Sequence, residues 1–138
     1  MSCNSAATSG SIFGELSRIM LAIKSVMADR DDIETLIFDE IDVGISGRTA
    51  QKVSEKMAVI GKKHQVICIT HLAQIAAMAD AHYAIEKTVT DGKTKTSISL
   101  LNAEQEIDEL ARILGGAEIT ETVKQSAAEM KELAKRTK

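Results

Sequence analysis

The chain has 138 residues, with 17 lysine and arginine residues against 20 aspartate and glutamate residues and a formal net charge of -3. This length gives room for one domain whose core needs neither disulfides nor metal. The acidic balance, with one tyrosine, two phenylalanines and no tryptophan, excludes a self-sufficient nucleic-acid binder that stacks bases. The apolar runs are far too short to cross a bilayer, and two cysteines far apart in the chain suit a reducing, cytoplasmic setting.

The start of the chain lacks both the basic segment and the continuous apolar segment of a secretory signal. We expect residues 1–13 to be a flexible lead-in or a tail added for expression, and residues 14–138 to form the folded unit. A helix is predicted over residues 14–28, because apolar side chains recur there at intervals of three and four. The stripe that we expect this helix to bury comprises Leu16, Ile19, Met20, Ile23, Val26 and Met27.

Two short apolar runs predict strands that are buried on both faces. The first run covers residues 35–38 and the second covers residues 66–70. Ser46 is a candidate N-cap for an amphipathic helix between them. The apolar side chains that mark this helix are Ala50, Val53, Met57 and Ile60. Strand, helix and strand in succession predict a right-handed parallel β-α-β unit.

The second half of the chain predicts a short helix, a hairpin and two longer helices. The short helix is expected over residues 72–79. Alternating apolar side chains around an Asp-Gly pair at residues 91–92 predict an antiparallel hairpin that extends the edge of the sheet. Residues 107–114 then form a helix that stops at Gly115, and Thr120 caps a last helix. The fold class is therefore α/β, with mostly parallel strands, flanking helices and a β-hairpin.

Polar residues follow both predicted parallel strands, at the edge where open α/β sheets bind ligands. Asp39 and Glu40 end the first strand, and His71 ends the second. A carboxylate in this place suits a hydrated Mg²⁺ beside nucleotide phosphates, and its neighbour can orient or deprotonate a water. A histidine near them can donate a hydrogen bond to a terminal phosphate. Each residue alone has an ordinary explanation in a turn or loop, so it is their combination and order that indicate nucleotide hydrolysis.

The ordered motifs from residue 14 onward resemble the C-terminal half of ABC-type ATPase heads of the SMC class. The resemblance rests on Gly-Glu-Leu-Ser-Arg at residues 14–18, Leu-Ile-Phe-Asp-Glu-Ile-Asp at 36–42, Gly-Ile-Ser-Gly at 44–47 and Ile-Thr-His at 69–71. In the repair proteins of this class, two heads hold ATP between them and couple its hydrolysis to the movement of long coiled coils. The resemblance implies a P-loop NTPase fold, ATP and Mg²⁺ as ligands, and a role in DNA double-strand-break repair and recombination.

The resemblance also implies a role for each matching residue. Asp39 resembles the Walker B aspartate that positions Mg²⁺, and Glu40 resembles the catalytic glutamate that polarises the attacking water. Asp42 falls in the D-loop, which crosses the dimer interface, and His71 matches the switch histidine that senses the γ-phosphate. The signature motif, which meets the ATP of the opposite head, comprises Gly14, Glu15, Leu16 and Ser17.

Two features depart from the family pattern. The signature normally begins Ser-Gly-Gly-Glu, but Ile12 and Phe13 precede Gly14 here. A Gly-x-x-x-x-Gly-Lys-Ser/Thr loop does not occur, because Lys87 stands where the first glycine of a match ending at residues 92–94 is required. We therefore expect a lobe that hydrolyses no ATP alone and that needs an N-terminal P-loop lobe of the same protein. Its further expected partners are a second head, in a homodimer, and DNA bound through the full-length protein in the bacterial cytoplasm, with no membrane.

Three other interpretations stay open. The head of another SMC-like ATPase, such as one of the cohesin type, shares the common motifs. A non-catalytic dimerisation or interaction module would use the same surface without chemistry. Removal of the N-terminal lobe would expose an apolar surface that the parent protein buries, and self-association of the chain would favour this interpretation. An independent metal-dependent hydrolase built on Asp39, Glu40 and His71 would need further ligands, and no further cluster is evident in the sequence.

Overall fold

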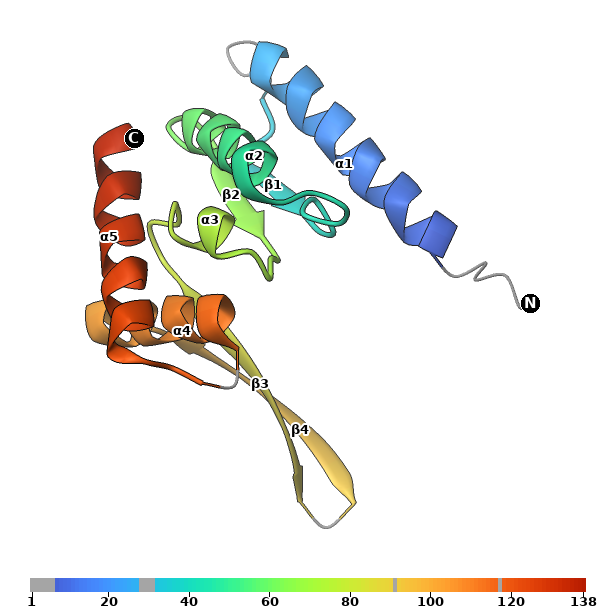
Figure 1. The fold of residues 1–138 in the computed structure, drawn as a ribbon. Coiled ribbons are helices and arrows are strands. Elements are labelled where there is room, and N and C mark those ends of the chain that lie inside the picture. The colour runs from blue at the N-terminus through green and yellow to red at the C-terminus, as the bar shows by residue number, and fades with distance from the viewer. Residues whose placement is uncertain (1–6, 28–31, 91, 117) are drawn as a thin grey trace, which may run out of the picture.

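The computed structural model describes residues 7–27, 32–90, 92–116 and 118–138 of the chain (Figure 1). Helix α1 (Ala7–Met27) begins seven residues before the predicted start at residue 14, so it includes part of the segment expected as a flexible lead-in. Residues 1–6 of that segment lie outside the described residues. The division of the chain at residue 14 stays a prediction.

A parallel pair of strands follows α1. Strands β1 (Thr35–Phe38) and β2 (Gln65–Cys68) pair in parallel and are joined through helix α2 (Gly47–Ile60), which confirms the predicted strand, helix, strand order. Phe38 lies opposite Cys68 at the carboxyl end of the pair. Ser46 is the N-cap of α2 by its extended backbone, but its side chain makes no capping hydrogen bond.

One face of this two-stranded sheet is buried and the other is exposed. Phe38 is 4% exposed, whereas Ile37, which points the other way, is 68% exposed. Ile67 lies opposite Ile37 and is also exposed. The prediction that both strands are buried on both faces is therefore wrong for this chain. Side chains alternate between the two faces of a strand, and the described helices cover the Phe38 face alone.

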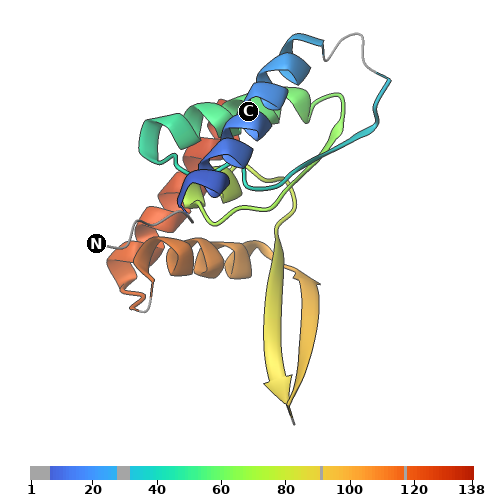
Figure 2. The ribbon, with the colours of Figure 1, turned by 90° about the vertical axis from the view of Figure 1, so that its right-hand side faces the viewer.

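Helix α1 packs against α2, as Figure 2 shows from the side, and its small and polar residues contact the loop after β1. Gly14 and Leu21 are buried, and Ser17 and Arg18 are half-buried. The predicted apolar stripe lies on the opposite side of the helix, so the expectation that it is buried here is wrong. The exposed fractions of its members lie between 46% and 86%: Leu16, Ile19, Met20, Ile23, Val26 and Met27.

Helix α3 (Ala73–Ala76), shorter than the predicted 72–79 segment, connects two hydrophobic clusters. Ile75 belongs to the first cluster, whose other buried members are Leu21, Phe38, Ile41, Val53, Met57 and Ile60. Ala73 and Ala76 belong to the second cluster, which lies between α4 (Ala103–Gly115) and α5 (Glu121–Thr137). Its other buried members are Ala77, Met78, Leu110, Ala111, Ala127 and Ala134. The small alanine side chains let α4 pack closely against α5 and α3.

The ends of the two C-terminal helices match the sequence signals. Gly116 follows α4 with a positive φ of 66°, a backbone conformation that favours glycine. Thr120 caps α5, because its Oγ1 accepts a hydrogen bond from Val123 N at 3.3 Å. Asn102 caps α4 in a full capping box with Gln105, which the sequence analysis did not predict.

The predicted hairpin forms, but it does not extend the parallel sheet. Strands β3 (Tyr83–Thr90) and β4 (Lys93–Leu100) pair in register as a separate two-stranded sheet. Figures 1 and 2 both show it projecting from the body of the molecule. Leu101 N donates a hydrogen bond to His82 O at 2.9 Å at the base of the hairpin. Strands β3 and β4 pair only with each other, and neither pairs with β1 or β2.

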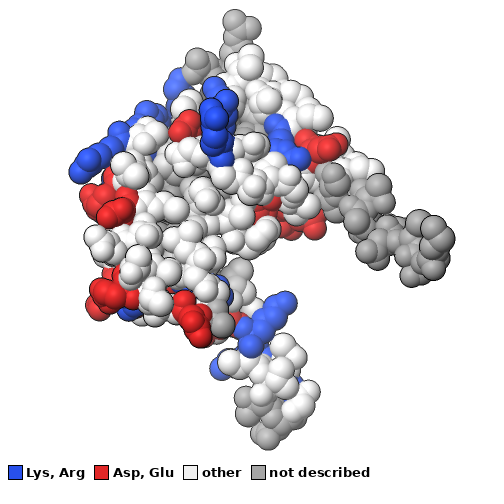
Figure 3. Space-filling model, in the orientation of Figure 1, with Lys and Arg blue, Asp and Glu red and all other residues white. Residues whose placement is uncertain are grey.

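The surface carries its charges in small groups. Figure 3 shows lysine, arginine, aspartate and glutamate side chains separated by broad uncharged areas on one face of the molecule. Within the described ranges, no helix is long and apolar enough to cross a membrane.

Candidate functional site

The site lies at the carboxyl ends of β1 and β2. Ile69 N donates to Phe38 O at 3.0 Å and extends the parallel ladder one step past the strands. Asp39 and Glu40 follow β1, and Thr70 and His71 follow β2, so the four residues share one edge of the sheet. The structure thus brings together the two segments that the sequence analysis singled out for chemistry.

Asp39 and Glu40 form a sharp turn directly after β1. The Asp39 Oδ1 atom accepts a hydrogen bond from Glu40 N at 2.9 Å, and both residues are exposed. Glu40 has a positive φ of 57°, which costs a residue with a side chain about 1 kcal/mol or more relative to an ordinary conformation. Strained backbone conformations are concentrated at functional sites, which makes this turn a candidate site.

Helix α1 holds this turn from one side. Ser17 Oγ donates to Asp39 O at 3.1 Å. A Cβ atom on Gly14 would lie 3.0 Å from both Glu40 O and Val43 O, so glycine is needed for the helix to approach this closely. Two of the predicted signature residues therefore contact the predicted Walker B turn of the same chain.

Arg18 supports the site, although the sequence analysis assigned it no role. Its Nη1 atom donates to Ile41 O at 3.2 Å and to Val43 O at 2.9 Å, which fixes the loop after Glu40 on α1. The signal was present in the sequence, because Arg18 belongs to the 14–18 motif. Glu15, a predicted signature residue, is exposed on α1.

Asp42 links the two strand ends from inside the protein. It is 3% exposed, and its Oδ2 atom accepts hydrogen bonds from Thr70 Oγ1 at 2.6 Å and from His71 N at 2.8 Å. The Nδ1 atom of His71 lies 3.0 Å from the same oxygen. The His71 side chain is nevertheless 72% exposed, so one edge of the ring is anchored and the rest faces outward.

Cys68 lies beneath these carboxylates and is not a nucleophile. Burial raises the pKa of the thiol to about 12, and the negative charges of Asp42 and Asp39 add to the effect. A thiolate is the reactive form of cysteine, so Cys68 stays a protonated, inert thiol at neutral pH.

The described residues include no group of three or more histidine, cysteine, aspartate or glutamate side chains with the spacing of a metal site. Asp39 fits a more modest role. It is an exposed carboxylate oriented through one oxygen by the Glu40 N–H group. Mg²⁺ is commonly bound by one or two carboxylates together with waters and substrate phosphates, so a single oriented aspartate suits it.

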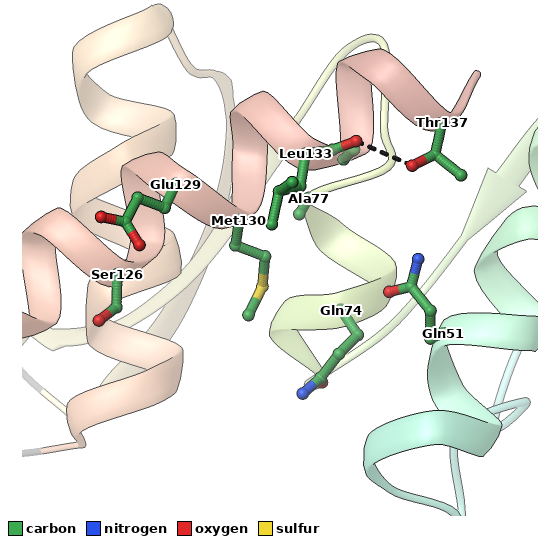
Figure 4. Close-up of a pocket in the computed structure, with 9 residues that line it drawn as sticks. Gln51, Gln74, Ala77, Ser126, Glu129, Met130, Leu133 and Thr137 are labelled. Carbon is green, nitrogen blue, oxygen red and sulfur yellow. Dashed lines mark hydrogen bonds between the residues drawn. The ribbon is translucent and has the colours of Figure 1, made fainter.

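A separate hollow of about 460 Å³ lies between α2, α3 and α5 (Figure 4). The residues that Figure 4 draws come from these helices and from Ala77, and Glu129 is the charged residue among them. This hollow contains none of the predicted site residues. The candidate chemistry lies instead on the open edge of the sheet.

Known sequences provide an independent comparison. The chain is 45% identical over 125 residues to the DNA repair protein RecN of Bacillus subtilis (strain 168), 46% identical over 120 residues to RecN of Haemophilus influenzae, and 50% identical over 103 residues to RecN of Treponema pallidum. These matches cover 91%, 87% and 75% of this chain. The chain corresponds to the C-terminal part of RecN. No protein-family model matches it.

The RecN relatives are much longer than this chain. The three matches cover 22%, 22% and 18% of the relatives, so the chain spans about a fifth of their length. The similarity to RecN confirms the resemblance that the ordered motifs indicated. Because it includes most of the chain, it extends well beyond the short motifs that SMC-like heads share.

Proposed function

We propose that this chain is the C-terminal lobe of a RecN-like ATPase head that acts in DNA double-strand-break repair and recombination, in the bacterial cytoplasm and at the nucleoid. The lobe would have a P-loop NTPase fold and supply the signature, Walker B, D-loop and switch-histidine elements. One observation carries the proposal: Asp39, Glu40 and His71 follow the carboxyl ends of two paired parallel strands in a chain that is similar to RecN over 91% of its length.

The proposal gives each residue at this edge a task toward ATP. Asp39 would hold Mg²⁺, which neutralises charge on the phosphate oxygens when it is bound. Glu40 would orient the attacking water and accept its proton, and the exposed His71 ring would meet the terminal phosphate. Gly14 and Ser17 pack beneath the turn, so we infer that α1 transmits nucleotide contacts of the signature to Asp39 and Glu40.

Uncovered apolar surface supports the proposed need for a second lobe. Ile37 and Ile67 on the open face of the sheet are exposed, as is the apolar stripe of α1. Large exposed apolar areas on a single chain mark surfaces that another segment covers. We propose that an N-terminal P-loop lobe of the same protein covers this surface and holds the ATP phosphates, and that a second head completes the site in a homodimer.

The same surface also favours the non-catalytic alternative. An interaction module would bury the apolar stripe of α1 against a partner and would leave ATP untouched. The two readings differ in one respect, because only the ATPase requires the Glu40 carboxylate.

Reconstitution tests the proposal directly. The chain would be assayed for ATP binding and hydrolysis with Mg²⁺, first alone and then mixed with a separately produced N-terminal lobe of a RecN relative. We expect turnover in the mixture and none in either part alone. Turnover by the chain alone would show an independent hydrolase. A mixture that forms a complex but neither binds nor hydrolyses ATP would favour the interaction module.

Glu40→Gln sharpens the test in a full-length RecN-like protein. We expect unchanged ATP binding and turnover that falls about 100-fold or more, because the amide cannot accept a proton from water. Glu34→Gln is the matched control, since Glu34 is an exposed glutamate that precedes β1 outside the site. Equal turnover in both variants would remove Glu40 from the proposed role.

A further inference from the structure

We propose that Asp42 is a positioning residue for His71: its buried carboxylate fixes the ring in the Nδ1–H tautomer and leaves Nε2 as the outward-facing ring nitrogen. This inference rests on the proposed function, because it describes how His71 would meet a phosphate or water. It differs from the D-loop role that the resemblance implies, which places Asp42 across a dimer interface.

The first step is the position of the Asp42 carboxylate. It is buried, and its Oδ2 atom accepts two hydrogen bonds, from Thr70 Oγ1 and His71 N of the same chain, and lies 3.0 Å from His71 Nδ1. Thr70 Oγ1 also accepts a hydrogen bond from Leu72 N at 3.1 Å, so the whole 70–72 turn is tied to this carboxylate. A buried carboxylate without hydrogen-bond donors would strongly destabilise the folded chain. Movement of the 70–72 turn away from Asp42 is therefore costly, and the turn is held in place.

The second step is the hydrogen on the His71 ring. An ionised carboxylate can only accept hydrogen bonds. The His71 Nδ1 atom lies 3.0 Å from Asp42 Oδ2, where an unprotonated nitrogen would set its lone pair against the carboxylate, so we infer that Nδ1 carries the hydrogen. A neutral imidazole has one ring N–H, so Nε2 of the neutral ring is then an acceptor.

The third step concerns what the exposed nitrogen can do. The His71 side chain is 72% exposed although Nδ1 is anchored, so Nε2 is on the open side of the ring. The neutral ring offers a lone pair to a water there. A ring that donates from Nε2 to a phosphate oxygen must carry both protons, with the Asp42 carboxylate as the adjacent counter-charge. Asp42 thereby determines which atom of His71 is presented and in which direction.

Nitrogen NMR of the 138-residue chain tests this tautomer. The ¹⁵N shifts and couplings of the imidazole rings would be recorded at about pH 8.5, where an imidazole is ordinarily neutral. We expect the Nδ1–H pattern for His71, assigned with a His71→Gln variant. His64 provides an internal reference, because its Nδ1 atom lies 2.6 Å from the Ile33 carbonyl oxygen and must also carry a hydrogen. An Nε2–H pattern for His71 in the unmodified chain would overturn the proposal.

Three variants separate positioning from general structural support. Asp42→Ala removes the acceptor, and we expect the His71 signals to shift toward the Nε2–H tautomer while those of His64 stay unchanged. Asp42→Asn can place its amide oxygen where Oδ2 lies, so we expect it to retain the Nδ1–H pattern. Thr70→Val removes a structural hydrogen bond and leaves the ring contact, so its His71 pattern should match the unmodified chain. An unchanged tautomer in a folded Asp42→Ala chain would contradict the positioning role.

The functional consequence is measured separately in a full-length RecN-like protein. We expect Asp42→Ala to lower kcat about tenfold or more with little change in KM, and Asp42→Asn to recover part of the loss. Glu40→Gln in the same assay reports on the ATPase proposal itself. If Glu40→Gln leaves ATP turnover unchanged, the proposed function is wrong whichever tautomer His71 adopts. If Glu40→Gln is inactive but Asp42→Ala is fully active, the positioning role fails alone.

Discussion

The two halves of the molecule bury their apolar side chains differently. Around α4 and α5, the cluster that includes Leu110 and Ala127 is closed, and both of these residues are fully buried. Around α1 and the β1–β2 sheet, a core forms on one side, while the stripe of α1 and the Ile37 face of the sheet stay exposed. The helices of the C-terminal half thus close a buried cluster between them, although Leu133 of α5 and the hairpin side chains stay exposed, and the N-terminal half has a core and an uncovered second face.

The buried side chains between α4 and α5 stabilise this chain, whereas the exposed side chains on α1 would add stability only if another segment covered them. An apolar residue stabilises a fold in proportion to the area that it removes from water. Leu110 is fully buried and stabilises the fold of this chain, whereas Leu16 is 55% exposed and adds little to its stability. The two leucines therefore contrast a side chain that stabilises this chain with one that the proposed N-terminal lobe would bury.

Leu110→Ala and Leu16→Ala give the largest expected contrast. We expect Leu110→Ala to lower the free energy of unfolding by about 3 kcal/mol, because it leaves a cavity in a closed core. The same truncation at Leu16, which is 55% exposed on α1, should change it by less than about 0.5 kcal/mol. Urea unfolding of the two variants beside the unmodified chain measures both.

Equal losses in the two variants would contradict the contrast, since they would mean that the α1 stripe is already buried in solution. Repeating Leu16→Ala in a full-length RecN-like protein sharpens the test. There we expect a clear loss of stability, because the proposed N-terminal lobe would cover the stripe.

Periodicity in the sequence predicted which elements form, but not which faces they bury. The spacing of apolar residues on α1 and the alternation in β3 and β4 are local properties, and both the helix and the hairpin formed as expected. Burial depends on what the rest of the chain places opposite. On α1 the contact is made by Gly14 and Arg18, because a glycine and a hydrogen-bonding arginine fit the turn after β1 better than a leucine would. The apolar periodicity of the helix does not reveal that preference, although both residues belong to the 14–18 motif.

The candidate site shows the same division. Asp39, Glu40 and His71 were placed at one sheet edge from strand ends alone, because parallel strands put their carboxyl ends together. The inward orientation of Asp42 was not predicted, since a residue in a glycine-rich loop has no periodicity that marks its side chain as buried. Its hydrogen bonds with Thr70 and His71 join residues 28 and 29 positions apart, and such contacts are visible only in the folded chain.

Lys131→Met tests the closure of the C-terminal half with a smaller effect. Lys131 Nζ pairs with Glu106 Oε2 at 3.0 Å and donates to Ala79 O at 3.0 Å, in a site where both charged side chains are largely buried. Removing the ammonium group leaves a carboxylate and a carbonyl unpaired, so we expect a loss of about 2 kcal/mol in urea unfolding. Adding Glu106→Met in the same chain should restore much of that loss, because it removes the unpaired charge.

Lys124→Met is the matched control for Lys131→Met. Lys124 pairs with Asp108 and joins the same two helices, but both side chains are exposed to solvent. Exposed ion pairs contribute little to stability, so the unfolding midpoint should stay where it is. A loss as large as that of Lys131→Met would show that charge between α4 and α5, and not burial, controls this interface.

The helix caps provide the smallest test of the comparison. In the C-terminal half, the Asn102 side chain accepts a hydrogen bond from Gln105 N at 2.9 Å and completes a capping box. We therefore expect Asn102→Ala to lower the free energy of unfolding by about 1 kcal/mol. In the N-terminal half, the Ser46 side chain makes no capping hydrogen bond, so Ser46→Ala should leave the free energy of unfolding nearly unchanged. Thr120→Ala should fall between them, because its capping contact is longer, at 3.3 Å. A cost for Ser46→Ala as large as that for Asn102→Ala would mean that Ser46 caps α2 in solution, and the two halves would then not differ at their helix starts.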